Sequence, residues 1–229
     1  MSIKAILNNR SEAIIESCVE TTQEALIASK NGADRIELCA DLAADGLTPS
    51  LNLLKNTFET VSIPIKVMLR PRAGNFIYNA EDHQIIEKHI AYCKAAGVEE
   101  WVYGSIAEGS GRLDLDNIRA FYNKVQPRSL TIHKAIDRSS DLLRDVFDLV
   151  KWAKGSEVNL SILSSGGQET AIEGAMMLNR MARICGEEVE LIIAGKVRHD
   201  NLAQIKKAIP APAYHGRHIV ALSEISSER

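Results

Sequence analysis

Short apolar runs, many of them rich in Val and Ile, alternate with longer amphipathic segments along nearly the whole chain. The short runs indicate strands and the longer segments indicate helices. Strands are expected at residues 13–19, 34–40, 64–70, 101–106, 130–136, 160–163, 189–194 and 213–215. Helices are expected at residues 21–32, 50–61, 80–96, 114–125, 141–154, 170–184 and 201–209. Such alternation is typical of α/β proteins with a parallel sheet.

Eight strands at intervals of about 25–35 residues favour a closed (β/α)8 barrel of the TIM type. The alternative is an open doubly wound sheet, which usually carries a GxGxxG turn after its first strand, and this chain has none there. We therefore expect one barrel domain over residues 1–229. Residues 221–229 are polar and too few for a full closing helix, so the last helix is expected to be reduced or missing. Apolar surface left at that gap would favour a homodimer or a higher homo-oligomer.

Composition excludes several classes of partner. The net charge of -3 gives no basic surface for nucleic acid. No apolar run approaches the roughly 20 residues of a membrane span, and residues 1–10 contain no signal-peptide core, so a cytoplasmic protein is expected. The cysteines are scattered without a CxxC pair, which favours reduced thiols. These four residues are Cys18, Cys39, Cys93 and Cys185.

In a barrel of this type, the functional site is built at the carboxyl ends of the strands. The segment 34–40 shows the pattern: Arg35, Glu37 and Cys39 share one face, and the aliphatic residues between them share the other. The polar face suits the mouth of the barrel. Reading every strand in this way gives the set Glu16, Cys18, Glu37, Cys39, Met68, Arg70, Ser105, His133, Ser164, Ser165, Lys196 and His215. So many polar groups at one mouth predict a pocket.

Three of these residues are candidates for proton transfer. Glu16 and Glu37 each stand two residues before a cysteine, and as a pair they could act as acid and base, one raising the pKa of the other. Alternatively, each neutralises Arg35 or Arg70 in an interior ion pair. His133 could act as a general acid or base, or be an interior histidine bonded to a neighbouring acid.

The two cysteines at the mouth are candidates for metal binding. Cys18 and Cys39 could hold a soft cation such as Cu(I), with the thioether of Met68 beside them. Cysteine is also a common small filler of buried positions, and adjacent strands can contribute to different interior layers. Both readings remain open from the residues alone.

Several residues at the mouth suit an anionic ligand. Arg70 and Arg72 flank Pro71, which stiffens the loop that carries their guanidinium groups. The run Ser164-Ser165-Gly166-Gly167 offers hydroxyl and backbone N–H groups ahead of a helix. The expected ligand-binding residues are Arg70, Arg72, Ser164, Ser165, Lys196 and His215.

At these residues the sequence resembles the CutC-like family, named for copper homeostasis, and the likeness runs from residue 16 to residue 216. Its most specific segments are Gly32-Ala33-Asp34-Arg35-Ile36-Glu37-Leu38-Cys39, Gly46-Leu47-Thr48-Pro49 and Val67-Met68-Leu69-Arg70-Pro71-Arg72. Weaker support comes from Ile132-His133-Lys134-Ala135-Ile136-Asp137, Leu163-Ser164-Ser165-Gly166 and His215-Gly216. The resemblance implies a cytosolic TIM-type barrel that forms homo-oligomers and is linked to copper.

The chain departs from the family pattern in three places. Ala73-Gly74-Asn75 stands where the family usually has Gly-Gly-Asp, and His133-Lys134 where it usually has His-Arg. After the seventh strand, Ala194-Gly195-Lys196-Val197 is one residue shorter than the expected glycine run. The shortening removes backbone donors that a phosphate would use, unless Lys196 replaces them.

Two functions of different classes follow. The first is copper handling, with Cu(I) bound by Cys18 and Cys39, which requires the thiols to face each other. The alternative is an enzyme acting on a small carboxylate or phosphate metabolite, anchored by Arg70, with Glu16, Glu37 and His133 as catalytic residues around an open cavity.

Overall fold

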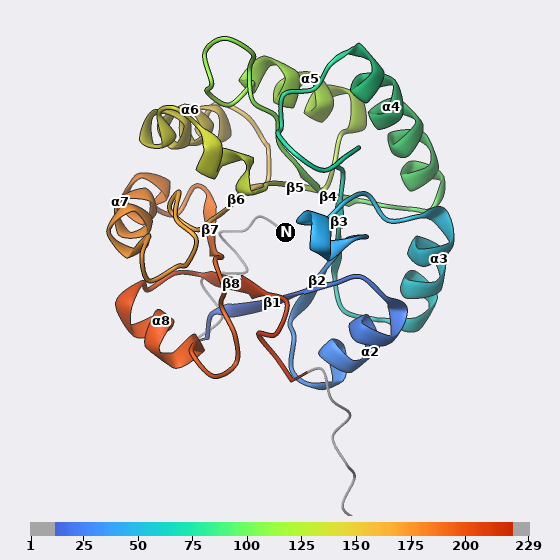
Figure 1. The fold of residues 1–229 in the computed structure, drawn as a ribbon, viewed down its shortest axis with the longest axis horizontal. Helices are drawn as coiled ribbons and strands as arrows, with labels where there is room; N and C mark the ends of the chain where they lie inside the picture. Colours follow the sequence, from blue (N-terminus) through green and yellow to red (C-terminus); the bar gives the residue numbers. More distant parts are fainter. Residues whose placement is uncertain (1–11, 222–229) are drawn as a thin grey trace, which may run out of the picture.

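Eight parallel strands close into a barrel in which each strand pairs with the next in sequence and β8 pairs with β1 (Figure 1). This computed structural model describes residues 12–221. The strands are β1 (Ile14–Val19), β2 (Arg35–Leu38), β3 (Ile65–Met68), β4 (Glu100–Tyr103), β5 (Ser129–Ile132), β6 (Leu160–Ser164), β7 (Glu190–Ile193) and β8 (Ala213–Gly216). Because the first and last strands are hydrogen-bonded, the predicted (β/α)8 barrel is confirmed and the open sheet is excluded.

Helices form a ring outside the strands (Figure 1). Between residues 12 and 221 there are seven α-helices, one after each of β1 to β7: α2 (Thr22–Lys30), α3 (Leu51–Thr60), α4 (Ala80–Ala95), α5 (Leu115–Val125), α6 (Leu142–Lys154), α7 (Ala175–Cys185) and α8 (Leu202–Ala208). Two 3-10 helices lie in the connections, η1 (Leu42–Ala44) and η2 (Lys134–Arg138). Up to residue 221 no helix follows β8, as the sequence predicts, and the predictions for residues 1–10 and 222–229 lie outside the described residues.

None of the helices between residues 12 and 221 combines the length and the hydrophobicity needed to cross a bilayer.

Local side-chain caps explain where two of the helices begin. The hydroxyl of Thr21 accepts a hydrogen bond from the Glu24 N–H at 3.1 Å at the start of α2, and Glu24 in turn accepts from the Glu20 N–H. Ser50 accepts from the Leu53 N–H at 3.3 Å at the start of α3. A Ser or Thr in this position satisfies an N–H that the helix itself cannot pair.

The two largest differences from the predicted boundaries are at the end of β5 and at the start of α7. The strand expected at 130–136 ends at Ile132, because His133 turns the chain by accepting the Ala135 N–H and so begins η2. The helix expected from residue 170 begins only at Ala175. Thr170 and Glu173 close a separate turn before it, each side chain accepting the backbone N–H of the other.

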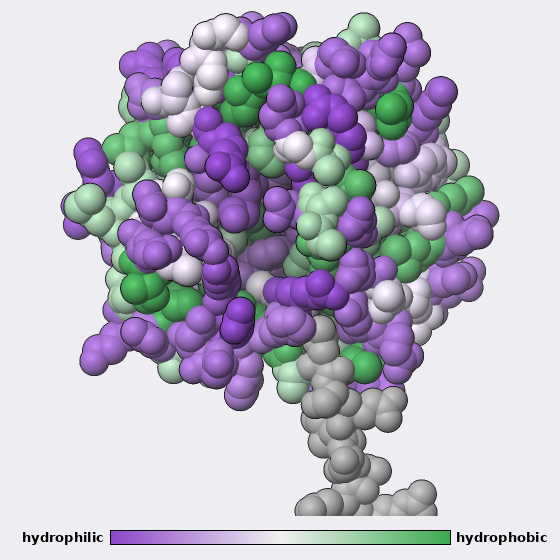
Figure 2. Space-filling model, in the orientation of Figure 1, coloured by the Kyte–Doolittle hydropathy of each residue, from purple (hydrophilic) through white to green (hydrophobic). Residues whose placement is uncertain are grey.

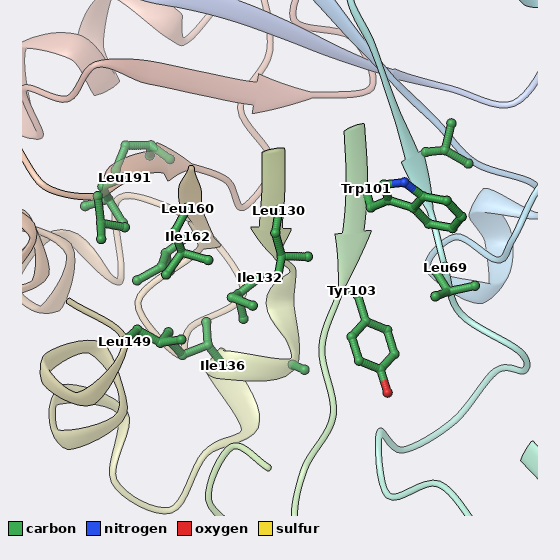
Figure 3. Packing of buried hydrophobic residues seen from close by; sticks show 14 of the residues in the cluster. Leu69, Trp101, Tyr103, Leu130, Ile132, Ile136, Leu149, Leu160, Ile162 and Leu191 are labelled. Atoms are coloured by element: carbon green, nitrogen blue, oxygen red, sulfur yellow. The ribbon is translucent and has the colours of Figure 1, made fainter. Parts of the chain in front are cut away.

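Apolar side chains fill the space between the strands and the helices (Figure 3). Leu130 and Ile132 point outward from β5, and Leu160 and Ile162 from β6, toward Leu149 of α6. All five side chains are fully buried. This layer supplies the hydrophobic contribution to the stability of the barrel, at roughly 25 cal/mol per Å² of apolar surface buried.

Inside the ring of strands, in contrast to the apolar layer outside it, several buried side chains are charged. Arg35 donates to Glu16 through Nε, and its two Nη atoms lie 3.1 and 2.8 Å from the carboxylate oxygens of Glu190. Lys66 Nζ donates to the Thr131 hydroxyl at 2.7 Å and lies 3.7 Å from Glu16 and 3.9 Å from Glu190. Burial favours the neutral acid, but the charges of Arg35 and Lys66 hold the pKa of Glu16 well below its usual range. The four charges therefore balance one another inside the barrel.

Large apolar side chains are exposed on a different side from the one that the sequence suggests. The gap after β8 lies between α8 and α2, whereas the large hydrophobic residues exposed within residues 12–221 are Phe147 on α6, Met176 on α7 and Ile172 just before α7. The homo-oligomer stays a prediction, and its apolar contact, if formed, would use these residues rather than the gap.

The first prediction concerns the charged interior. Replacing Arg35 with Met removes the cation that contacts both buried carboxylates and leaves Glu190 facing only Lys66 at 3.9 Å, so the free energy of unfolding in urea at pH 7 should fall by about 3–5 kcal/mol. Arg144→Ala is the matched control, because Arg144 is exposed and its pair with Asp148 at 3.3 Å is worth less than about 1 kcal/mol. Equal losses in the two variants would contradict a structural role for the interior network.

The second prediction concerns assembly. Light scattering at micromolar concentration should report a mass near twice 25.2 kDa or more. Met176→Glu should shift that mass toward the monomer, because a charge at this exposed position opposes an apolar contact. A monomeric wild-type protein would refute the homo-oligomer.

Candidate functional site

A cavity of about 1230 Å³ lies at the carboxyl ends of the strands. Figure 2 looks along the barrel and shows a hollow near the middle of this face, bordered mainly by hydrophilic residues. Of the residues expected at the mouth, those lining the cavity are Cys18, Glu37, Cys39, Met68, Arg70, His133, Ser165, Lys196 and His215. Glu16, Arg72, Ser105 and Ser164 lie outside this lining.

The two mouth thiols face each other. Cys18 Sγ lies 3.9 Å from Cys39 Sγ, and both sulfurs lie within 3.5 Å of Glu37 Oε2. The strand register causes this arrangement, because β1 and β2 pair Cys18 with Glu37, and Cys39 follows two residues later on the same face. Met68 and Val102 pack against the pair. The alternative in which the two cysteines occupy separate layers is therefore not what this barrel adopts.

His215 joins this cluster to the charged interior. Its Nδ1 lies 2.8 Å from Glu16 Oε1 and its Nε2 lies 3.6 Å from Glu37 Oε2, because β8 pairs His215 with Glu16 of β1. Burial alone would lower the pKa of His215, but Glu37, Cys18 and Glu16 together raise it well above its ordinary value. These contacts therefore favour the protonated form of His215.

The pKa values of Glu37, Cys18 and Cys39, which surround His215, are shifted in different directions. Burial raises the pKa of Glu37 to about 8, against the opposing charge of His215. The hydrogen bond from Cys39 lowers the pKa of Cys18 to about 5, and contact with His215 adds to this effect against the cost of burial. Cys39 shifts the other way, since its bond to Cys18 and its burial raise its pKa well above the ordinary value. These contacts therefore favour the thiolate form at Cys18 and the thiol form at Cys39.

Arg70 is held by backbone and not by acids. Its Nη1 donates to the carbonyls of Ala44 and Gly46 at 2.8 and 3.2 Å, and its Nη2 to the carbonyl of Gly74 at 2.9 Å. The side chain thus ties the loop after β2 to the loop after β3. Arg70 follows the end of β3. The sequence allows Glu16 to pair with either Arg35 or Arg70, and in the structure it pairs with Arg35.

His133 is a neutral ring that packs against Phe76 and feels the charge of Arg70. Its Nδ1 accepts the Ala135 N–H at 3.1 Å, so the ring proton of the neutral form is assigned to Nε2. Burial and then the charge of Arg70 lower the pKa of His133 to about 3. Gly104 makes room for this ring, since a Cβ there would lie 2.9 Å from it, and Phe76 packs on it with centroids 4.9 Å apart.

The serine-glycine loop already binds an anion, and that anion belongs to the chain. Asp137 accepts from the Ser164 hydroxyl at 2.5 Å, from the N–H and hydroxyl of Ser165 at 2.9 Å each, and from the Gly167 N–H at 3.0 Å. Asp137, in the loop after β5, therefore occupies the donors predicted to hold a ligand. The serine-glycine sequence correctly indicates that the loop binds an anion, but it does not indicate that the anion is a side chain of the same protein.

Two other cations expected to bind a ligand are paired within the protein. Arg72 Nε donates to Asp82 at 2.9 Å, and its Nη2 donates to the Ile77 carbonyl at 2.8 Å, which fixes the loop before α4. Lys196 pairs with Glu169 at the rim of the cavity.

Sequence reasoning missed Lys66, Glu190 and Asp137. A signal existed for two of them, because Lys66 and Glu190 each interrupt an apolar strand at an inward-facing position. Asp137 has no comparable signal, because its partners come from another strand end about 27 residues away.

The fold and the site together define a (β/α)8-barrel protein with a polar cavity containing a pair of thiols at its carboxyl end. The chain matches the model of the CutC family over residues 13–219 and belongs to that family. This family is the one that its sequence motifs resemble.

Relatives agree with this assignment. The CutC family protein of Histophilus somni is 31% identical over 201 residues, covering 88% of this chain and 80% of the relative. The human copper homeostasis protein cutC homolog is 30% identical over 202 residues, covering 88% of this chain and 72% of the relative. The family therefore links the chain to copper homeostasis.

Solved structures extend the comparison. A CutC structure from Streptococcus agalactiae superposes with a TM-score of 0.81 at 26% identity, covering 91% of this chain and 100% of that one. Phosphoribosyl anthranilate isomerase from Thermococcus kodakaraensis superposes with a TM-score of 0.55 at 15% identity, covering 89% and 87%. The second likeness shows the barrel fold alone.

A third prediction follows from the neutral state of His133. Between pH 6.5 and pH 3 the unfolded chain carries a proton on this ring that the folded chain does not, so stability should fall as pH decreases through 6.5. Relative to His133→Asn, which keeps an acceptor for the Ala135 N–H, the wild type should lose about 2 kcal/mol more between pH 7 and pH 5 in urea titrations. Parallel pH profiles for the two proteins would show that the ring is not held neutral.

Proposed function

We propose that the chain binds Cu(I) through Cys18 and Cys39 and serves copper homeostasis in the cytoplasm. The observation that carries the proposal is the 3.9 Å separation of the two sulfurs at the floor of the cavity. Thiolates favour Cu(I) over harder cations, and family membership points to the same metal.

The thiol pair fits a single soft ion. The separation of 3.9 Å is less than twice a metal–thiolate bond of about 2.3 Å, so one ion can contact both sulfurs without movement of the strands. Met68 adds a polarizable thioether beside them. The contacts of Cys18 lower its pKa and so favour the thiolate form that a soft cation binds.

A second group of possible ligand atoms nearby is a poorer site. Glu16, Glu37 and His215 also bring their ligand atoms within 4.8 Å of one another. Glu16, however, is already paired with Arg35, and the protonated form of His215 that its contacts favour has no lone pair to offer a metal. The thiols are therefore the favoured ligands.

The fourth prediction tests this site. Under reducing conditions the wild-type protein should bind one Cu(I) in competition with a chromophoric chelator, and Cys18→Ser/Cys39→Ser should abolish that binding. The control is Cys93→Ala/Cys185→Ala, which removes the two buried thiols of α4 and α7. Unchanged affinity in the Cys18/Cys39 variant would transfer binding elsewhere and reject the proposal.

A further inference from the structure

Three buried polar atoms around the cavity have no hydrogen-bond partner among the described residues. They are Glu37 Oε1, Arg70 Nε and His133 Nε2, and all three residues line the same space. Buried polar atoms in native proteins are nearly always paired, so three unpaired atoms on residues that line one cavity indicate an external partner. Two of them, Arg70 Nε–H and His133 Nε2–H, are donors.

Arg70 also has no counter-ion. Its side chain is buried, with the residue only 2% exposed, and within residues 12–221 no carboxylate forms an ion pair with it. Backbone carbonyls hold two of its nitrogens, and Phe76 lies 4.7 Å from the guanidinium carbon. Neutral partners do not cancel the charge, and a buried unpaired charge is costly. An anion in the cavity would compensate it.

His133 supplies a second donor on the same side of the cavity. The ring of Phe76 contacts both side chains, with its centroid 4.7 Å from the Arg70 guanidinium carbon and 4.9 Å from the His133 centroid. Because Nδ1 is occupied by the Ala135 N–H, the His133 proton at Nε2 is held in place as a donor. One cationic and one neutral donor thus flank one aromatic ring.

We propose that Arg70 Nε–H and His133 Nε2–H bind the carboxylate group of a small molecule in the barrel cavity. This site uses different side chains from the Cu(I) site and does not depend on it. A carboxylate carries one negative charge and so matches the single positive charge of Arg70. A phosphate dianion would leave one charge unpaired, and the serine-glycine donors that would suit it are engaged by Asp137. Leu163 and Ile106 line the same cavity and offer an apolar surface to the body of the ligand.

The fifth prediction uses metal-free protein labelled with 15N-arginine. Titration with acetate or succinate should move the Nε–H signal of Arg70 to saturation, whereas chloride at equal ionic strength should not. The signal is identified by its loss in Arg70→Lys. Saturable movement with inorganic phosphate but not with the carboxylates would overturn the assignment of ligand class, and no saturable movement with any anion would overturn the site.

Variants separate binding from structural support. His133→Asn keeps the acceptor for the Ala135 N–H but withdraws the donor at Nε2, so it should raise the dissociation constant for succinate by about tenfold or more. His133→Gln can again present an N–H and should restore part of the affinity. Cys18→Ser/Cys39→Ser should bind succinate as the wild type does, because neither thiol contacts the carboxylate. Wild-type affinity in His133→Asn, or lost affinity in the cysteine variant, would contradict the proposed pair of donors.

Discussion

The guanidinium of Arg35 lies between the carboxylates of Glu16 and Glu190 inside the barrel, and the arrangement of the mouth depends on it. With Lys66 it cancels the charge of both acids, so Glu16 remains ionised although it is fully buried. Glu37 and Cys18, together with the ionised Glu16 that lies 2.8 Å from Nδ1, raise the pKa of His215. Electrostatic coupling in a region of low dielectric therefore runs from the interior of the barrel to the cavity.

The residues that line the cavity include two chemically different groups. The thiols Cys18 and Cys39 with Glu37 are the ligands proposed for a soft cation. Arg70 and His133, each with an unpaired buried nitrogen, are the donors proposed for a carboxylate. The two proposals therefore concern separate atoms in one space, and either can hold without the other.

The sequence predicts the barrel well because each strand end carries a local signal, such as the alternation of Arg35, Glu37 and Cys39. The same alternation places the cysteines of β1 and β2 on the inward face, but it leaves open whether they occupy one layer, and only the strand register brings their sulfurs within 3.9 Å. Partners that depend on the three-dimensional register could not be predicted. Arg70 binds carbonyls of two loops, and Asp137 fills the serine-glycine loop, because the height of each side chain in the barrel is set by strand pairing and loop shape.

The central claim is that the interior charges prepare Cys18 and Cys39 to hold Cu(I), and X-ray absorption spectroscopy of the copper-loaded protein tests it most directly. The account predicts that the copper spectrum is dominated by sulfur neighbours, and that these are lost when both cysteines are replaced by serine. A first shell of nitrogen and oxygen alone, or sulfur neighbours that persist in the variant, would contradict it.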